Sequence, residues 1–409
     1  MDEFLTEQVT ELPLDRSDWQ LVKFGDIAIQ QKESVDRENT DLTRYVKGEH
    51  MGSEDLHLRE WGELTDEYLG PAFIRKFEQG DILYGSRRTY LRKVAVAHFD
   101  GITSNTTFVI KANQTRVDKR LLPFVLLSEG FAEHSIRNSK GSVNPYINWK
   151  DIANYEFLLP PKDQQAKLAE LLWAMDEVVE KSKSMVECLE NYRDSIANRI
   201  FSKNANDYLV DLPFIIDPSR LKEFFLETVC DLITDGAHAS PRSADSGMPM
   251  ATVENMRNSL IDVDSCRTIS PEDFYSLVQN NCQPQIGDVL FSKDGTIGKT
   301  FVFNQNQRMV LLSSIAIIRT KKNELDPEYC SLMMRSPVFF SEIEKRKSGT
   351  ALKRVVLKDI KKFKILLPEI NSQKKVSAFI CNLNKRIEEL TVYILNSKSL
   401  QKSLINHIC

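Results

Sequence analysis

Two stretches of the chain show a heptad pattern of apolar side chains, and each predicts a long α-helix. Apolar residues recur at alternating steps of four and three residues from about 163 to 201 and again from about 373 to 409. This pattern is typical of a coiled-coil seam, and helices of this length extend about 55–60 Å. The seam positions are Leu168, Leu172, Met175, Val179, Val186, Leu189 and Ile196, and then Val376, Ile380, Leu383, Ile387, Leu390, Ile394 and Leu404.

The two seams match each other, which favours packing between two helices of one chain. The second helix follows an intervening segment that brings the chain back along the first, so we expect an antiparallel intramolecular coiled coil. Polar residues interrupt the seams at different places, Ser182 and Arg193 in the first helix and Ser397 and Gln401 in the second. Such interruptions fix register. Pairing between two copies of the chain is the alternative.

The segment before each long helix contains short runs rich in β-branched and aromatic residues, separated by glycine and proline. These runs predict strands joined by turns, at 81–84, 94–97, 107–110 and 155–159, and at 288–291, 300–303, 315–318 and 363–367. One further helix is expected in each segment, at 121–137 and at 326–347. The fold class is therefore α+β, with two similar mixed α/β domains and two long helices.

The two segments are copies of one structural unit. Matching motifs are shifted by 207 or 208 residues, so the duplication has few net insertions and predicts an internal pseudo-two-fold symmetry. The expected boundaries are 1–161 for the first domain, 162–203 for its helix, 204–221 for a linker, 222–369 for the second domain and 370–409 for its helix. The matching motifs are Gly80-Asp81-Ile82-Leu83 and Gly287-Asp288-Val289-Leu290, Gly141-Ser142 and Gly349-Thr350, Leu158-Leu159-Pro160 and Leu366-Leu367-Pro368, and Gln165 and Gln373.

Composition excludes several classes of protein. The 409 residues contain 42% hydrophobic residues but no apolar run long enough to span a membrane, and the N-terminus lacks a signal-peptide pattern. We therefore expect a cytoplasmic protein. The seven cysteines and six histidines are dispersed, without the spacing of a zinc site, which predicts reduced thiols and no bound metal. The net charge of −4 does not by itself indicate nucleic-acid binding, so local cationic runs must decide.

Motifs of catalysis and nucleotide binding are incomplete. The loop 295–300 ends like a phosphate-binding P-loop, but Lys293 stands where that loop needs its first glycine. The tetrapeptide at 211–214 approaches the signature of amino-methyltransferases, with Leu212 in place of one proline. The sequence also lacks a Gly-x-Ser-x-Gly elbow and a His-Glu-x-x-His helix. We therefore expect a protein that binds rather than catalyses.

A duplicated unit that ends in Leu-Leu-Pro and continues into a glutamine-containing amphipathic helix resembles the specificity subunit of type I restriction–modification systems. The resemblance covers about residues 18–409. It departs at Glu369, which replaces a proline, and at Arg87-Arg88, where the second copy has a glycine-rich loop. The matching segments are Gly80–Leu83, Gly287–Leu290, Ser292–Lys299, Lys140–Ile147 and Leu158–Leu172.

This resemblance implies that each mixed domain is a target recognition domain that reads one half of a bipartite sequence in double-stranded DNA. The helices would set the spacing and dock two modification (methyltransferase) subunits, which restriction and translocation subunits join. S-adenosylmethionine, ATP and Mg²⁺ would belong to those partners, so no cofactor and no catalytic residue is expected in this chain. A coiled-coil scaffold with two protein-binding heads, or a fused DNA methyltransferase or nuclease, is the alternative.

Two cation-rich runs stand out, residues 84–93 in the first copy and 345–354 in the second. Cations recur in both copies at two places, just after the Gly-Asp-(Ile/Val)-Leu strand and around the Gly-Ser or Gly-Thr turn. Charge runs are usually solvated surface, but recurrence at matching positions favours contact with DNA. Lysines would mostly contact phosphates, and an arginine could reach a guanine. The residues expected to face DNA are Arg87, Arg88, Arg92, Lys93, Lys140, Ser142 and Asn144, and then Lys293, Lys299, Lys347, Thr350, Lys353 and Arg354.

Overall fold

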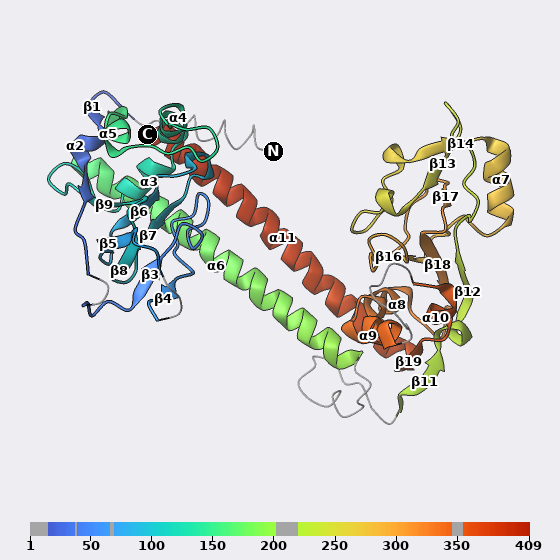
Figure 1. Cartoon of the computed structure of the whole chain (residues 1–409). Helices are drawn as coiled ribbons and strands as arrows, with labels where there is room; N and C mark the ends of the chain where they lie inside the picture. Colours follow the sequence, from blue (N-terminus) through green and yellow to red (C-terminus); the bar gives the residue numbers. More distant parts are fainter. Residues whose placement is uncertain (1–14, 37–38, 66–68, 202–219, 346–354) are drawn as a thin grey trace. The chain divides into compact units, whose positions relative to one another are not determined.

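The computed structural model describes residues 15–36, 39–65, 69–201, 220–345 and 355–409. The chain divides into two compact units, the first formed by Met1–Ser184 with Leu390–Cys409 and the second by Met185–Glu389. Each unit contains one mixed domain and a part of each of two long helices, α6 (Lys162–Ile200) and α11 (Ile370–Ile408) (Figure 1). Both helices were expected from the heptad pattern, within a few residues of these bounds.

The domain of the first unit contains two four-stranded sheets. One has the order β2-β9-β6-β7 with antiparallel neighbours, and the other has the order β4-β3-β8-β5, in which β3 and β8 are parallel. A separate antiparallel pair, β1 and β10, leads directly into α6. The strands are β1 (Gln20–Lys23), β2 (Ala28–Gln31), β3 (Arg44–Val46), β4 (Gly62–Glu63), β5 (Phe73–Phe77), β6 (Ile82–Gly85), β7 (Val94–Val96), β8 (Gly101–Ser104), β9 (Thr107–Ala112) and β10 (Glu156–Leu159).

The domain of the second unit repeats this arrangement. Its main sheet has the order β12-β18-β15-β16, a second sheet has the order β14-β13-β17 with β13 and β17 parallel, and β11 pairs with β19 before α11. The strands are β11 (Lys222–Phe225), β12 (Cys230–Asp235), β13 (Met248–Ala251), β14 (Arg267–Ile269), β15 (Val289–Ser292), β16 (Thr300–Val302), β17 (Val310–Leu311), β18 (Ile315–Thr320) and β19 (Lys364–Leu367). The duplication seen in the sequence is therefore a duplication of fold.

The single helix expected in each domain is in fact two. Ser128 separates α3 (Leu122–Leu127) from α4 (Glu129–Arg137), and Ser336 separates α8 (Pro327–Met334) from α9 (Pro337–Lys345). Each serine hydroxyl donates to a carbonyl oxygen of the preceding helix and accepts the N–H of a phenylalanine in the next one. A buried serine with both roles ends one helix and caps the next, which apolar periodicity does not reveal. The other α-helices of the described residues are α2 (Phe24–Ile27), α5 (Trp149–Ala153), α7 (Pro271–Gln279) and α10 (Leu357–Lys361).

Each domain core is completed by the ends of both long helices. In the first unit, Leu404 and Ile408 near the end of α11 join the core that contains Leu168 and Leu172 of α6. The second unit has the equivalent contacts at positions shifted by 208 residues. There Ile196 and Ile200 at the end of α6 join the core that contains Val376 and Ile380 of α11. The compact units therefore cross the helix boundaries expected from the sequence.

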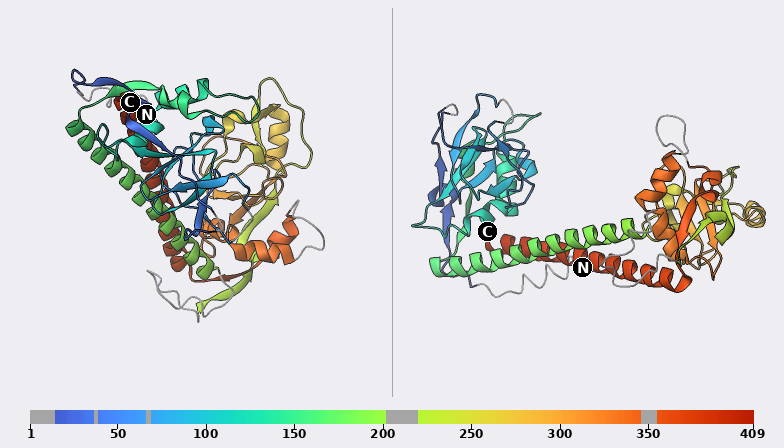
Figure 2. Two further views of the ribbon diagram at one scale, coloured as in Figure 1. Left: turned by 60° about the vertical axis from the view of Figure 1, so that its left-hand side comes forward. Right: turned by 90° about the horizontal axis from the view of Figure 1, so that it is seen from below.

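Within each unit α6 and α11 lie side by side and run in opposite directions (Figures 1 and 2). Two polar seam residues join them: the Gln401 amide donates to the Leu172 carbonyl oxygen at 3.1 Å, and Arg193 donates to the side chain of Asn384 at 3.3 Å. The seam residues Leu168, Leu172, Val179, Ile196, Val376, Ile380, Ile387 and Leu404 are buried, and Met175, Val186, Leu189, Leu383, Leu390 and Ile394 are half-buried. The antiparallel intramolecular pair is confirmed.

The repeated glutamines attach each domain to the first turn of its helix. The Gln165 amide donates to the carbonyl oxygens of Pro160 and Arg116 at 2.8 and 3.3 Å, and it accepts the N–H of Asp118 at 2.7 Å. Gln373 makes the equivalent three bonds, with Pro368, Glu324 and Asp326, at 2.9, 3.0 and 2.9 Å. Both side chains are almost completely buried. The repeated glutamine is therefore a structural residue.

Candidate nucleic-acid interface

Two loops of the first domain meet to form a surface that we call the tip, residues 86–91 and 140–146. The second loop is closed by Lys140 and Tyr146, whose backbone groups exchange two hydrogen bonds of 2.8 and 2.9 Å. The first loop is attached to it because the N–H of Arg88 donates to the carbonyl oxygen of Pro145 at 2.6 Å. The structure thus brings together the Arg87-Arg88 and Gly141-Ser142 motifs, which the sequence analysis placed at one interface.

Five of the expected DNA-facing residues lie on the tip with exposed side chains: Arg87, Arg88, Lys140, Ser142 and Asn144. The guanidinium Nε of Arg88 donates to the side-chain oxygen of Asn144 at 3.3 Å, which links the two loops a second time. The ammonium of Lys140 lies 3.4 Å from a carboxylate oxygen of Asp151. Their contact with DNA stays a prediction, but their exposure and proximity are what it requires.

The backbone of the first loop explains why the two copies differ here. Arg88 and Arg92 adopt left-handed conformations with φ of 50° and 49°. The matching loop of the second copy uses glycines at positive φ, Gly295 at 69° and Gly298 at 102°. A non-glycine residue in this region costs about 1–2 kcal/mol. The first copy therefore accepts backbone strain in order to carry arginine side chains.

Arg92 and Lys293 are corrected from the predicted interface to the fold. The Arg92 side chain is 14% exposed, and its guanidinium bonds Glu54 and Glu129 at 2.5 and 2.7 Å. Lys293 is 1% exposed, with its ammonium 3.2 Å from a carboxylate oxygen of Asp235. A buried ammonium is stable only beside such carboxylates. Neither cation is therefore available to a DNA backbone, and the position of each residue after the Gly-Asp-(Ile/Val)-Leu strand did not reveal this.

The remaining predicted cations have mixed placements. The ammonium groups of Lys93 and Lys299, which occupy matching positions, each donate to a backbone carbonyl oxygen in the preceding loop of their own domain, Gly48 and Met256. Lys93 is half-buried and Lys299 is exposed, so contact with DNA remains a prediction for both. The other four predicted residues, Lys347, Thr350, Lys353 and Arg354, lie outside the described residues.

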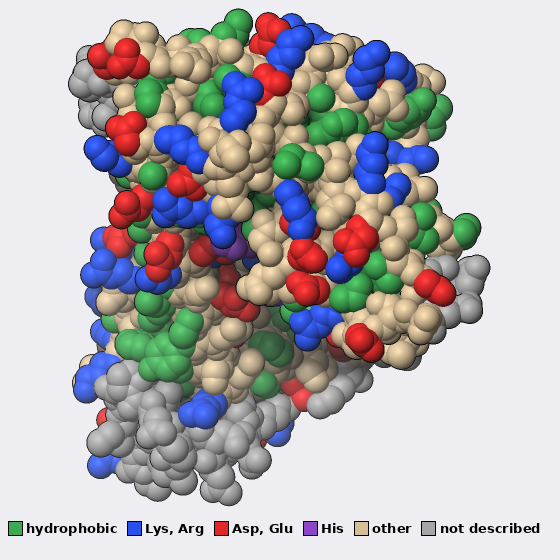
Figure 3. Space-filling view, turned by 90° about the vertical axis from the view of Figure 1, so that its left-hand side faces the viewer, with side chains coloured by type: hydrophobic (Ala, Val, Ile, Leu, Met, Phe, Trp, Pro, Cys, Tyr) green, Lys and Arg blue, Asp and Glu red, His purple; other side chains and the backbone are tan. Residues whose placement is uncertain are grey.

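The sequence analysis missed the apolar side chains of the tip and its surroundings. Val143 at the apex of the second loop is 90% exposed, Tyr90 53%, Ile136 44% and Tyr146 43%. The face of the first unit in Figure 3 intersperses Lys and Arg with Asp, Glu and apolar side chains, rather than forming a continuous basic surface. Attention to an apolar residue inside a Gly-Ser-x-Asn-Pro turn could have identified Val143.

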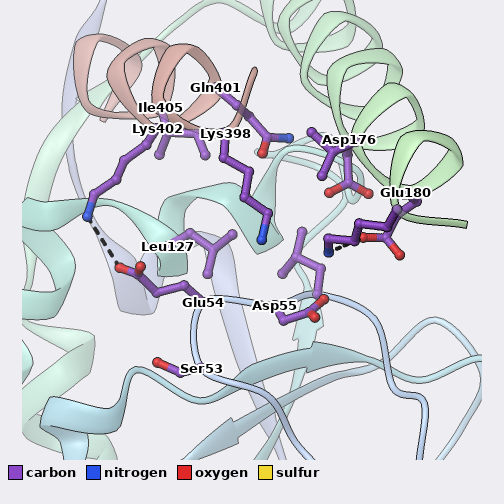
Figure 4. A pocket seen from close by; sticks show the side chains of 13 residues that line it. Ser53, Glu54, Asp55, Leu127, Asp176, Glu180, Lys398, Gln401, Lys402 and Ile405 are labelled. Atoms are coloured by element: carbon purple, nitrogen blue, oxygen red, sulfur yellow. Dashed lines mark hydrogen bonds and ion pairs between the residues drawn. The ribbon is translucent and has the colours of Figure 1, made fainter. Parts of the chain in front are cut away.

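The first domain is also held to the two long helices by a network of ion pairs, of which Figure 4 draws the one between Glu54 and Lys402 of α11. The His57 Nε2 lies 2.7 Å from a carboxylate oxygen of Asp176 on α6, and this hydrogen bond raises the pKa of the imidazole. Arg59 bonds both Asp55 of its own loop and Glu180 of α6. Ligand atoms of Asp55, His57 and Glu180 lie within 4.8 Å of one another, as in a metal site. Since Arg59 and Asp176 already pair with these groups, the cluster is best described as an ion-pair network.

The network borders a cavity of about 190 Å³ that also receives Lys398 and Lys402 from α11. Two cavities of the second unit, of about 410 and 460 Å³, are lined in part by the residues that match the lining of this cavity at an offset of 208. There Asn384 replaces Asp176 and Arg335 replaces Leu127. The second unit therefore lacks, among its described residues, the counterpart of the His57–Asp176 pair.

The loop that resembles a P-loop is closed by its own hydrogen bonds. The Ser292 hydroxyl donates to the carbonyl oxygen of Thr296 at 2.6 Å and accepts the N–H of Lys299 at 2.8 Å, while the N–H of Gly298 donates to the Ser292 carbonyl at 3.1 Å. These backbone amides are directed at Ser292 instead of at a phosphate.

Among the described helices, none is sufficiently long and apolar to cross a membrane.

One family of known proteins matches both repeats of the chain. The family model described as type I restriction modification DNA specificity domain matches residues 16–187 and again residues 218–396. The chain belongs to this family. The two matches cover the two duplicated units and most of both long helices.

Individual relatives are distant but similar in length and fold. The chain is 20% identical to the type I restriction enzyme MjaVIII specificity subunit of Methanocaldococcus jannaschii, over 91% of this chain and 87% of that protein. It is 26% identical to the EcoDI specificity subunit of Escherichia coli over 47% of this chain and 43% of that protein. The solved type I restriction–modification S subunit from M. genitalium superposes with a TM-score of 0.61 at 13% identity, over 97% of this chain and 98% of that one. A chain from a structure of type I restriction–modification complex assembly gives 0.59 at 19% identity, over 97% and 99%. These structures show the same fold.

Proposed function

We propose that this protein is the DNA-specificity subunit of a type I restriction–modification complex, with each mixed domain reading one half of a bipartite target. The observation that carries the proposal is the match of the DNA specificity family to both repeats. The exposed cations of the tip support it, because sequence is read by side chains at base edges while phosphate contacts supply most of the affinity.

The chain's own role is recognition and not catalysis. Its repeated polar residues serve the fold: Gln165 and Gln373 attach each domain to its helix, and Asp81 and Asp288 accept a backbone N–H at the turn before β6 and β15. S-adenosylmethionine, ATP and Mg²⁺ are assigned to partner subunits. This division of labour leaves the chain to determine where on DNA those subunits act.

The outer faces of the long helices are the proposed docking surface for two modification subunits, which restriction and translocation subunits then join. Leu171, Val178, Met185 and Tyr192 recur every seven residues along α6 and are 41–52% exposed. A regular apolar stripe beside the packed seam exposes area that a partner would bury.

The experiment that tests the proposed function is methylation mapping in cells that express the chain with its modification subunits. We expect one bipartite target, with adenines modified in both halves. Replacing the first domain by that of a relative should change one half of the target and leave the other intact. The replacement must keep the residues that seat Leu404 and Ile408, because the end of α11 completes the core of this domain. A complex that modifies DNA without sequence preference would refute the proposal.

Inserting one helical turn at matched places in α6 and α11 should lengthen the spacer between the two half-sites and leave both half-site sequences unchanged, because helix length sets the separation. A change in the half-site sequences themselves would contradict the assignment of the helices as a spacer.

A further inference from the structure

The apex of the tip presents a single apolar side chain in a fixed position. Val143 is 90% exposed, although valine is usually found in protein interiors. Its loop is closed by the two hydrogen bonds between Lys140 and Tyr146, and Gly141 makes the turn at φ of 92°. A short, closed loop loses little further conformational freedom when it binds a ligand. Val143 is therefore held in an exposed position before any ligand binds.

The adjacent loop holds the two residues that follow Val143. The N–H of Arg88 donates to the carbonyl oxygen of Pro145 at 2.6 Å, and its side chain donates to Asn144 at 3.3 Å. Arg88 makes both bonds from a left-handed backbone conformation, in a loop where the second copy uses glycines. Strain of this kind is maintained where the surrounding structure needs a particular side chain, and it is frequent at functional sites. Arg88 thus positions the apex of the neighbouring loop.

The charges around Val143 indicate what kind of surface it meets. Arg87, Arg88 and Lys140 surround the apex with exposed cations, and the carboxylate beside Lys140, that of Asp151, also accepts a hydrogen bond from Asn148. The centre of a protein–protein interface is depleted of charged residues, whereas cations around a protruding side chain match the phosphates that border a DNA groove. A protruding valine bordered by cations therefore fits a DNA groove better than a partner protein.

The chemistry of the valine side chain limits which features of a base pair it can recognise in a DNA groove. Its side chain has no hydrogen-bond donor or acceptor, so it contributes to base recognition only through apolar contact. The methyl group of thymine is the apolar group that base pairs present in the major groove. We propose that Val143 is a specificity-determining residue of the first recognition domain and contacts a thymine methyl group in the major groove. This inference rests on the proposed DNA-reading function.

The test combines a protein change with a DNA change. The complete complex, carrying wild-type chain or Val143→Ala, is titrated with its mapped target DNA in which each thymine in turn is replaced by uracil, which lacks only the methyl group. Wild-type complex should lose about fourfold in affinity at one thymine of one half-site, the loss expected when a single methyl contact disappears. The Val143→Ala complex should bind the thymine and uracil forms of that position equally.

Ile29→Ala is the matched control. Ile29 is an exposed apolar residue of the same domain (52%) that lies away from the tip. It pairs with Lys111 on β9, four residues along that strand from Thr107, and it is Thr107 that pairs with Gly85 beside the tip. This variant should discriminate uracil as wild type does. Thymine–uracil discrimination that survives in Val143→Ala at every position refutes the inference and leaves the proposed function intact. Loss of modification-subunit binding by Val143→Ala, with unchanged base discrimination, would assign the tip to a protein contact. Absence of any specific binding by wild-type complex would refute the proposed function itself.

Discussion

The ion pair between His57 and Asp176 offers a sharp test of how the first domain is attached to α6. The change Asp176→Asn removes the charge and keeps the shape, and it introduces the residue found at the matching position of the second unit, Asn384. We expect the variant to be less stable than wild type near pH 6 and to approach wild type at alkaline pH.

The magnitude follows from the geometry of the pair. The two atoms are 2.7 Å apart, and the side chains are 35% and 15% exposed. A hydrogen bond to a charged group contributes about 1.5–3 kcal/mol. Since a third of the imidazole is exposed, solvent screening reduces this to about 1 kcal/mol. For a cooperative unit of this size, the midpoint of thermal unfolding should fall by roughly 2–4 °C.

The pH dependence has a definite sign. The pKa of His57 is raised in the folded protein by its hydrogen bond to Asp176. The extra stability is therefore fully present below the ordinary histidine value of 6.5 and is lost as the pH rises through the raised pKa. Scanning calorimetry of wild type and Asp176→Asn between pH 5.5 and pH 9 measures the difference directly. We expect the gap between the two unfolding midpoints to shrink by more than half across this range.

The neighbouring residue provides the control. Glu177 lies on the solvent side of α6, where it forms an exposed ion pair with Lys181. Glu177→Gln should leave the unfolding midpoint unchanged over the same pH range. A stability loss in Asp176→Asn that is independent of pH, or is matched by Glu177→Gln, would show that the His57 pair does not attach this domain to the helix.

Three further outcomes follow from the contacts of single residues. Gln165→Leu and Gln373→Leu each leave three backbone groups without their partner, so calorimetry should show similar losses of about 1–3 kcal/mol in the two variants; a loss in only one of them would contradict their equivalence. Lys293→Met removes the buried ammonium beside the Asp235 carboxylate, which is then paired with the exposed imidazole of His238, and should lower stability by about 3 kcal/mol, whereas Lys322→Met at an exposed site should have no effect in the same denaturant titration. Arg88→Gly relieves the left-handed backbone while removing the cation, so unfolding should be unchanged or shifted to higher temperature, while DNA affinity falls and its salt slope decreases by about one. An unchanged slope would place Arg88 away from phosphate.

Local patterns in the sequence were sufficient for the architecture. The heptad positions of α6 and α11 are directly encoded, because helical periodicity and seam packing depend on residues a few positions apart. The duplication was equally visible, since both copies keep their turn glycines and the Leu-Leu-Pro segment. Three strands of each main sheet, β6, β7 and β9 and then β15, β16 and β18, were found within one or two residues, and the fourth, β2 or β12, was missed. Those of the second sheets were missed because several contain only two or three residues, too few to show an alternating pattern.

The candidate site depended on tertiary structure. Arg87, Arg88, Arg92 and Lys93 are neighbours in one cation-rich run, yet the fold exposes the first two and pairs Arg92 with two glutamates. A run of charges does not encode which of its members meets a buried carboxylate, because that partner comes from a distant segment. Lys293, outside that run, shows the same dependence, since its partner Asp235 belongs to the distant strand β12.

By itself, the sequence determined that this protein has two copies of one mixed domain and two long helices that pack on each other, since repeats and heptads are recorded residue by residue. Tertiary structure alone decided that each domain core is completed by the end of the other helix, as at Leu404 and Ile196. It also decided that Val143 stands exposed at the apex of a loop that Arg88 joins to its neighbour. Burial and exposure are properties of the packed chain: a side chain is assigned to the core or to the surface only when segments far apart in sequence come together.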